Sequence, residues 1–195
     1  MFDRARDGGL IGDAPELAVD ATGLETRHAS RYFVLRAGYD RFPRLRWPKL
    51  SLACHTRSHL IAAAVVTDGP SQDSPQFPAV MRQAAPLAGW RRVLADAAYD
   101  GEHNHRLCRE GLGIPETVIA LNPRNAGRRW PRTPYRRAMR QHFPKAAYDQ
   151  RWQVESAIAR HKRRLGPGLR ARSPTSQADE CLLRVVTHNL MLLAA

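Results

Sequence analysis

Short apolar runs recur along the chain and predict the strands of a sheet. Each run stops at a polar or turn-forming residue, and together they cover residues 17–19, 49–55, 59–67, 91–96 and 116–121. The second and third runs flank Thr56-Arg57-Ser58, for which a β-hairpin is the simplest interpretation. Because the third run is rich in alanine, a helix stays open as an alternative for it.

Apolar residues at intervals of three and four predict helices between and after these runs. Such a pattern covers residues 74–88, where Ser74 is the expected cap and Pro75 the first helical residue. A short helix is expected over residues 101–110, and a long one over residues 145–165. These helices alternate with the strands along the chain.

The end of the chain carries a further helix. Gly166-Pro167-Gly168 ends the long helix before it, and Ser173-Pro174 has the composition of a helix start. We expect the buried side of this last helix to be formed by Leu182, Leu183, Val186, Leu190 and Leu193.

The order of elements predicts the fold class. It reads strand, hairpin, helix, strand, helix, strand, helix, helix, which predicts an α/β fold with a mixed sheet flanked by helices. We expect one domain over residues 17–195, preceded by a loose, polar N-terminal segment over residues 1–16. Residues 26–47 give a weak loop signal, and residues 123–144 have too little apolar content to pack by themselves.

The charge of the chain is strongly basic and unevenly distributed. Lys and Arg number 31 against 18 Asp and Glu, a net charge of +13. Residues 121–170 hold 14 of these basic side chains but only Asp149 and Glu155 as acids. A polyanionic partner explains this concentration better than a solvated surface does, and nucleic acid comes before an anionic membrane surface.

Other side chains exclude several classes of protein. Cys54, Cys108 and Cys181 are odd in number and far apart, which predicts buried thiols in a cytoplasmic protein rather than disulfides or a zinc site. His55 and His59 fall across the predicted turn without a third ligand, so surface histidines are favoured over a metal pair. No apolar run is long enough to span a membrane, and the start of the chain does not resemble a secretory signal.

Two aspartates stand where predicted strands end. Asp20 follows the first apolar run and Asp96 ends the fourth. In open α/β sheets the ends of strands are where functional sites form, although a turn residue or a helix cap is the ordinary alternative. Asp100 is a rival to Asp96, but it fits better as the cap of the next helix.

A third carboxylate belongs to a stripe along the long helix. The motif is Tyr148-x2-Arg151-x3-Glu155-x6-Lys162, and these positions share one side of a helix. Val154, Ala157, Ile158, His161 and Leu165 form the adjacent apolar side. By spacing alone, a solvated face with an Arg151–Glu155 ion pair explains the stripe as well as a functional site does.

The stripe is similar to the signature of DDE transposases of bacterial insertion sequences. Asp20-Ala-Thr-Gly resembles the first aspartate motif of that family and Asp96-Ala-Ala-Tyr the second, in the expected order. The resemblance covers residues 17–193 and implies a ribonuclease-H-like fold, with both aspartates on neighbouring strands and Glu155 on a later helix. It makes Asp20, Asp96 and Glu155 the expected catalytic and metal-binding triad.

The resemblance also implies the chemistry. Two Mg²⁺ (or Mn²⁺) ions held by the triad would activate a water and stabilise the departing 3′ oxygen during phosphodiester cleavage. In strand transfer a freed 3′-OH replaces water as the nucleophile. The expected substrate is double-stranded DNA, at the ends of the element and at its target.

Basic and aromatic residues around the triad are the expected DNA contacts. Arg151 and Lys162 would bind phosphates, and Tyr148 would hydrogen-bond a phosphate or stack on a base. Flanking DNA would be held without reading its sequence by Arg124, Arg128, Arg129, Arg132, Arg136 and Arg137.

The early position of Asp20 leaves no room before it for the segment with which such transposases recognise their terminal repeats. We therefore expect an N-terminally truncated transposase, in the cytoplasm and associated with the nucleoid. Its expected partners are a second copy on DNA and a separate N-terminal transposase fragment. Two alternatives stay open: a ribonuclease-H-like nuclease without strand transfer, and a non-catalytic DNA-binding relic.

Overall fold

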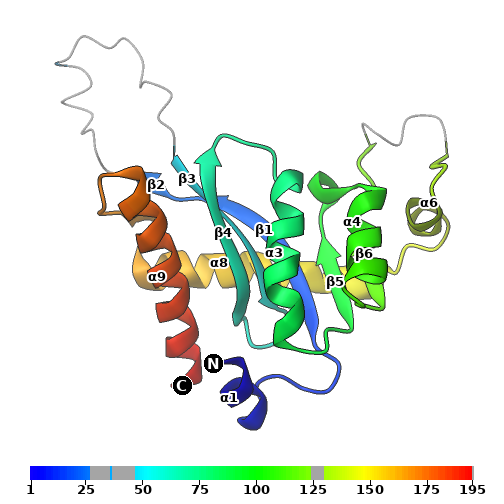
Figure 1. Ribbon diagram of the computed structural model, residues 1–195, viewed down its shortest axis with the longest axis horizontal. Coiled ribbons are helices and arrows are strands. Elements are labelled where there is room, and N and C mark those ends of the chain that lie inside the picture. The colour runs from blue at the N-terminus through cyan, green and yellow to red at the C-terminus, as the bar shows by residue number, and fades with distance from the viewer. Residues whose placement is uncertain (27–35, 37–46, 124–129, 195) are drawn as a thin grey trace.

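Five strands form a mixed sheet at the centre of the computed structural model, which describes residues 1–26, 36, 47–123 and 130–194. The strand order is β4-β3-β1-β5-β6. Their bounds are β1 Glu16–Gly23, β3 Trp47–His55, β4 Ile61–Gly69, β5 Arg92–Ala95 and β6 Glu116–Ile119. This arrangement confirms the predicted α/β class with a mixed sheet flanked by helices (Figure 1).

The sheet is antiparallel on one side of β1 and parallel on the other. β3 pairs antiparallel with both β1 and β4, so the predicted hairpin is confirmed and the helical alternative for residues 59–67 is wrong. β5 pairs parallel with β1 and with β6. A separate small sheet joins β2 (Glu25–Thr26) to β7 (Gly168–Leu169).

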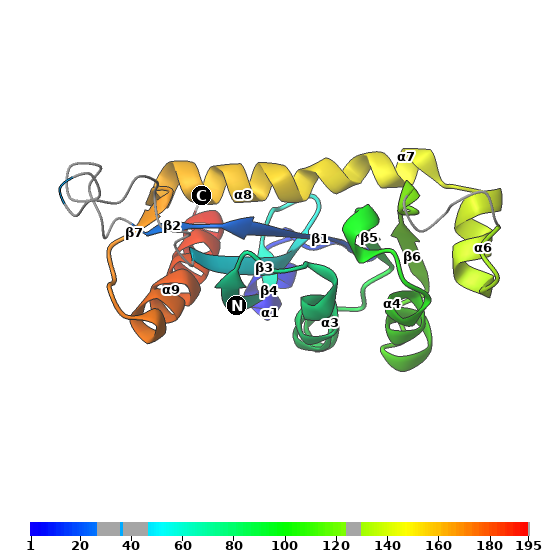
Figure 2. The same cartoon turned by 90° about the horizontal axis from the view of Figure 1, so that it is seen from above.

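Helices cover both faces of the sheet (Figure 2). On one face lie α3 (Phe77–Ala84) and α4 (Glu102–Arg106), and across the other runs α8 (Trp152–Leu165). Residues alternate between the two faces along β1. Leu17 and Val19 join the core under α3, whereas Ala18 joins the core under α8.

Several predicted helices differ in detail from the expectation. The helix expected over residues 74–88 is α3 between the 3₁₀ turns Ser74–Gln76 and Ala85–Leu87, and Asp73 rather than Ser74 holds the capping position. The short helix continues after α4 as a π turn over Leu107–Gly111. The long helix comprises α7 (Lys145–Tyr148), a 3₁₀ turn (Asp149–Arg151) and α8. Residues 123–144 contain α6 (Pro134–Gln141), and most of the loop expected over residues 26–47 lies outside the described residues.

The N-terminal residues are ordered by packing, not loose. They form α1 (Phe2–Asp7), whose Phe2 and Ala5 are buried. The Phe2 ring meets Trp90 edge to face, with ring centroids 6.3 Å apart. Two apolar residues three positions apart were enough to attach this otherwise charged helix to the core under α3.

The buried side of α9 (Pro174–Leu193) is not the one expected. Ser173 caps the helix as predicted, but Leu183 is 65% exposed. Leu182, Val186 and Leu190 are exposed as well, and of the five expected residues Leu193 packs partly buried against the core under α3. The side that faces the sheet carries Gln177, Cys181, Val185, His188 and Asn189.

Asn189 explains this orientation. Its side chain accepts the backbone N–H of Ile61 and donates to the Ile61 carbonyl, both at 2.8 Å. β4 is an edge strand, so its outward backbone groups need partners when a helix covers them. Hydrogen bonding to these backbone groups of β4 outweighed the burial of the α9 leucines.

The two histidines expected at the surface are buried. His55 is 1% exposed and bonds Ser58 at 2.8 Å, and His59 is 8% exposed and bonds Gln153 at 2.6 Å. His55 therefore stabilises the hairpin turn, and His59 links this turn to α8. Among the described helices, none is long and apolar enough to cross a membrane.

Candidate active site

Asp20 and Asp96 are adjacent because of the register between two parallel strands. Val19 of β1 pairs with Ala95 of β5, and each aspartate is the next residue along its strand. β1 itself continues to Gly23 along β3, so Asp20 lies inside a strand and not at its end as expected. The pairing with β5 nevertheless stops at Val19, and the two strands separate where the carboxylates begin.

Both carboxylates project toward α8. Side chains two positions apart on a strand share a face, and Ala18 and Leu94 belong to the core under α8. Asp20 and Asp96 each follow two residues later, so they leave the sheet on that same face. A helix that crosses this face is therefore placed to add a third group.

Short backbone hydrogen bonds orient the two aspartates. The Oδ1 atom of Asp20 accepts the N–H of Ala21 at 2.8 Å. Asp96 caps the 3₁₀ turn Ala97–Tyr99, with its Oδ1 atom accepting the N–H of Ala98 at 2.8 Å. Each carboxylate keeps a second oxygen for another partner.

Arg151 joins the sheet carboxylates to the helix stripe. Its guanidinium lies 3.8 Å from the Asp20 carboxylate and forms a close ion pair with Glu155. It also lies 5.9 Å from the ring centroid of Tyr148. Arg151 thus links Asp20 to Glu155 and Tyr148 of the expected site.

Lys162 lies further along the same helix. Seven residues separate it from Glu155, which is about 10 Å along the axis. Within the described residues no ion pair involves it. It flanks the carboxylate cluster and is not part of it.

The pKa of Asp20 is affected by the other two carboxylates nearby. Burial raises the pKa of Asp20 to about 6, and the negative charges of Asp96 and Glu155 also raise it. The hydrogen bond from Ala21 and the charge of Arg151 act in the opposite direction. Three acidic side chains this close together repel one another, and this repulsion favours a cation between them.

The donor set suits a hard divalent ion, although the side chains are not gathered around one. Carboxylate oxygens are the ligands that Mg²⁺ prefers. In the described part of the chain, no three His, Cys, Asp or Glu side chains are close enough to form a ready metal site. Instead Arg151 lies beside Asp20 and Glu155 and supplies the positive charge.

Asp100 has a structural role that the sequence did not reveal. Its side chain is fully buried, bonds Arg136 through both oxygens at 2.7 and 2.8 Å, and accepts the N–H of Asn122 at 2.9 Å. It does not cap α4, whose capping position is Gly101. Asp100 and Arg136 together attach α6 to the sheet.

The other arginines expected to bind DNA are exposed or lie outside the described residues. Arg132 and Arg137 are exposed near the start of α6, and Arg137 makes long contacts with the carbonyls of Pro131 at 3.4 Å and Arg132 at 3.5 Å. Arg124, Arg128 and Arg129 lie outside the described residues.

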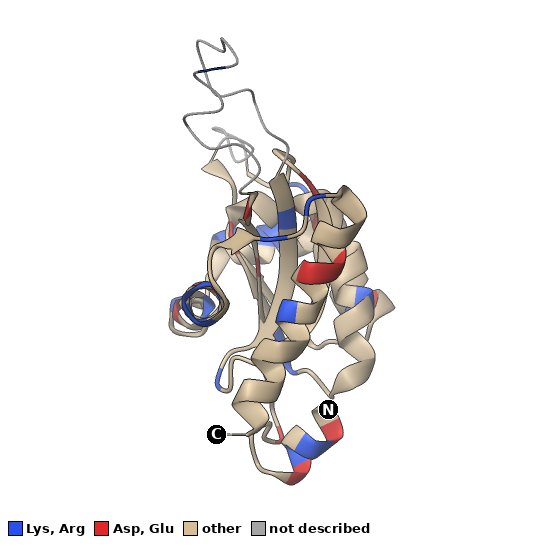
Figure 3. Cartoon of the chain, turned by 90° about the vertical axis from the view of Figure 1, so that its left-hand side faces the viewer, with Lys and Arg blue, Asp and Glu red and all other residues tan. Residues whose placement is uncertain are grey.

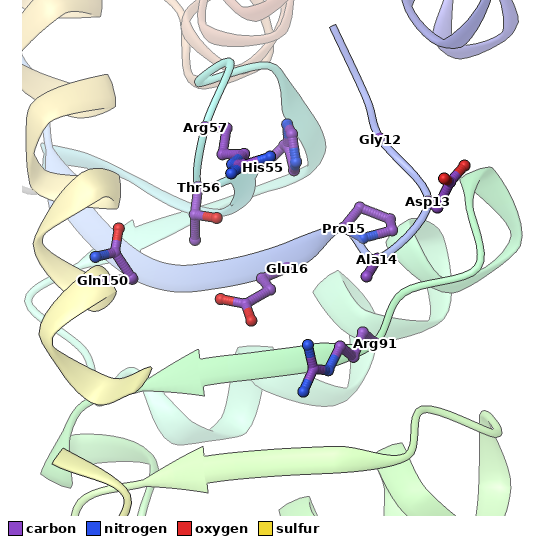
Figure 4. Close-up of a pocket in the computed structure, with 10 residues that line it drawn as sticks. All are labelled: Gly12, Asp13, Ala14, Pro15, Glu16, His55, Thr56, Arg57, Arg91 and Gln150. Atoms are coloured by element: carbon purple, nitrogen blue, oxygen red, sulfur yellow. The ribbon is translucent and has the colours of Figure 1, made fainter. Parts of the chain in front are cut away.

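A cavity of about 430 Å³ lies at the opposite end of β1 (Figure 4). It is lined by charges of both signs, including Glu16, Arg57 and Arg91. Glu16 is bound at 2.6 Å by Arg92, which also bonds Glu116 on β6 at 2.6 Å. These ion pairs connect three parallel strands, so this end of the sheet is stabilised by charge and lacks the excess of acid seen at Asp20.

A comparison with protein families agrees with this geometry. The family model described as "Transposase DDE domain" matches residues 11–192, nearly the whole chain. The family is one of metal-dependent enzymes that cleave DNA, and the five-stranded mixed sheet with its flanking helices is consistent with the ribonuclease-H-like fold of such transposases. The chain belongs to the DDE transposase family and forms the catalytic domain of a transposase.

Proposed function

We propose that Asp20, Asp96 and Glu155 are the catalytic triad of this transposase and hold two divalent ions, Mg²⁺ or Mn²⁺. The observation that carries the proposal is the strand register, because it sets Asp20 beside Asp96 on the face that α8 crosses. Contact of Arg151 with both Asp20 and Glu155 supports the inclusion of the third acid. When bound, the ions supply activation of the nucleophile and stabilisation of the departing 3′ oxygen.

The residues around the triad position the DNA. Arg151 and Lys162 bind phosphates near the scissile bond, and Arg151 can do so with two parallel hydrogen bonds. Tyr148 hydrogen-bonds a phosphate or stacks on a base. In cleavage the nucleophile is water, and in strand transfer it is the 3′-OH of the cleaved end.

Arg151 has a second role before DNA arrives. It is only 19% exposed, and its guanidinium partly neutralises Asp20 and Glu155. Without it, three carboxylates would repel one another in a half-buried site. Arg151 therefore stabilises the folded site in the absence of ions.

Flanking DNA contacts come from the basic segment before α7. We propose Arg124, Arg128, Arg129, Arg132 and Arg137 for this role, which positions the duplex without reading bases. We give Arg136 a structural role instead, because both oxygens of buried Asp100 are bound to it. The resemblance to insertion-sequence transposases adds two further proposals, a homodimer on DNA and a cytoplasmic location at the nucleoid.

The triad is tested with Asp96→Asn, which keeps the shape of the side chain and removes its charge. We expect cleavage of a labelled duplex in Mg²⁺ to fall by at least about a hundredfold, as when an essential electrostatic group is lost. The matched control is Asp3→Asn on α1, a side chain that is 86% exposed and remote from the sheet carboxylates. Equal cleavage by both variants would refute the assignment of Asp96.

Strand transfer is tested separately, with a labelled DNA that already ends in the 3′-OH. We expect joining of this end to a target duplex, and its loss in Glu155→Gln. Cleavage without any joining would refute the transfer step while leaving the triad in place. Neither cleavage nor joining in Mg²⁺ or Mn²⁺ would refute the proposed activity.

A further inference from the structure

A second groove lies on α8, away from the carboxylates. It has a volume of about 440 Å³ and runs between α8 and the turn that follows β3. Its lining includes His59, Trp152, Ser156, Arg160, Arg163 and Arg164. None of these residues has a part in the site described above.

The far side of the groove faces away from the catalytic stripe. Successive residues of a helix are about 100° apart. Arg160 and Arg164 follow Glu155 by five and nine residues, so they leave α8 about 140° and 180° away from it. Arg163 and Trp152 leave the helix nearer to the stripe, about 80° and 60° from Glu155, so the groove extends from beside the stripe to the far side of α8.

The groove carries positive charge without local compensation. Within the described residues no ion pair involves Arg160, Arg163 or Arg164. By contrast, Arg136 and Arg151 are each held by a carboxylate. Figure 3 looks along α8 from its C-terminal end and marks the Lys and Arg positions on the ribbon in blue. Uncompensated guanidinium groups on one helix favour an anionic ligand.

The wall of the groove also holds an exposed aromatic side chain. Trp152 is 53% exposed, so its indole N–H and its ring are open to a ligand.

We propose that this groove binds the sugar-phosphate backbone of double-stranded DNA, at a segment other than the one held by the triad. Arg160 and Arg164 are one helical turn apart, about 6 Å along the axis. Phosphates follow one another about every 3.4 Å along each strand of a duplex, so neighbouring phosphates are within reach of both. The inference rests on the proposed function for the identity of the polyanion.

The test compares two pairs of charge-removing substitutions. Arg160→Gln with Arg164→Gln changes the far side of the groove, and Arg4→Gln with Arg82→Gln removes the same charge from exposed arginines of α1 and α3. Affinity for a labelled duplex is measured by fluorescence anisotropy without divalent ions, over a series of salt concentrations. We expect the groove pair to weaken binding about tenfold and the control pair less than about twofold.

The salt dependence adds an independent readout. Each lost phosphate contact lowers the slope of log affinity against log salt by about 0.9, so the groove pair is expected to lower it by about 2. Equal losses in both pairs would show an effect of net charge alone and overturn the inference. Binding of anionic vesicles in place of duplex DNA would also overturn it.

Two controls keep the outcomes separate. Thermal melting confirms that each variant is folded. If the glutamine pair is not folded, Arg160→Lys with Arg164→Lys replaces it and is expected to weaken duplex binding, since lysine keeps the charge but loses bidentate contacts. Cleavage by the wild-type chain tests the proposed function. Intact cleavage with equal affinities in both pairs refutes the groove alone, whereas no cleavage with weaker binding by the groove pair refutes the activity alone.

Discussion

Substitution of Arg136 tests whether this residue binds DNA or forms a structural ion pair with Asp100. The perturbation is Arg136→Gln, which leaves the fully buried carboxylate of Asp100 without the guanidinium that binds both its oxygens. Removing one partner of a buried pair costs about 3–5 kcal/mol. Arg136 is 19% exposed and Asp100 keeps the N–H of Asn122, so we expect the lower part of that range, about 3–4 kcal/mol.

The assay is urea unfolding of the wild type and of two variants. Arg137→Gln is the matched control, because Arg137 is the next residue on α6 and is exposed. We expect it to change the free energy of unfolding by less than about 0.5 kcal/mol while weakening duplex binding. The reasoning is refuted if Arg136→Gln unfolds like the wild type and loses DNA affinity, since Arg136 would then act on DNA.

The packing of the chain supports three further predictions. Asn189→Leu leaves the N–H and carbonyl of Ile61 unpaired and is expected to lower the free energy of unfolding by about 2–4 kcal/mol, whereas the exposed Leu183→Ala is expected to change it by less than about 0.5 kcal/mol. Phe2→Ala removes the contact with Trp90 and is expected to cost about 2–4 kcal/mol in the same assay; no loss would mean that α1 contributes nothing. Burial lowers the pKa of His55, His105 and His161 to about 4 and also lowers that of His188, whereas it raises the pKa of Asp20 to about 6. Because the histidines outnumber this one acid, the unfolded chain binds more protons below pH 6.5, and stability is expected to fall between pH 6.5 and 4. Because each pKa unit corresponds to about 1.4 kcal/mol, urea titrations at pH 7 and pH 4 should differ by at least about 2 kcal/mol, and a flat profile would contradict the burial of these rings.

The strands and the order of the acids could be predicted because their signals are local. A strand of four to nine residues shows its alternation or its apolar run within its own sequence, and Asp96 follows such a run directly. The same holds for the Arg151–Glu155 spacing on one side of a helix. The proximity of Asp20 to Asp96 then depends only on two strands pairing in parallel.

The features that the sequence did not reveal depend on partners far along the chain. Asn189 is 128 residues from Ile61, so the backbone need that turned α9 is absent from the pattern of α9 itself. Asp100 has the composition of a helix cap, and only the position of Arg136, 36 residues later, makes it a buried anchor. His59 likewise became buried through Gln153. In each case a long-range hydrogen bond outweighed a local preference.

The triad proposed here therefore depends on packing as much as on its own residues. Val154 and Ala157 are fully buried against the sheet, and together with His161 they fix the rotation of α8 about its axis. That rotation decides which residues of the helix face the strand-borne aspartates and which face the second groove. Because side chains at Glu155 and at Arg164 leave the helix on opposite sides, one buried stripe orients both surfaces at once. A transposase that must hold DNA while cutting it can use the two sides of a single helix for the two tasks, since neither can turn without displacing the core beneath it.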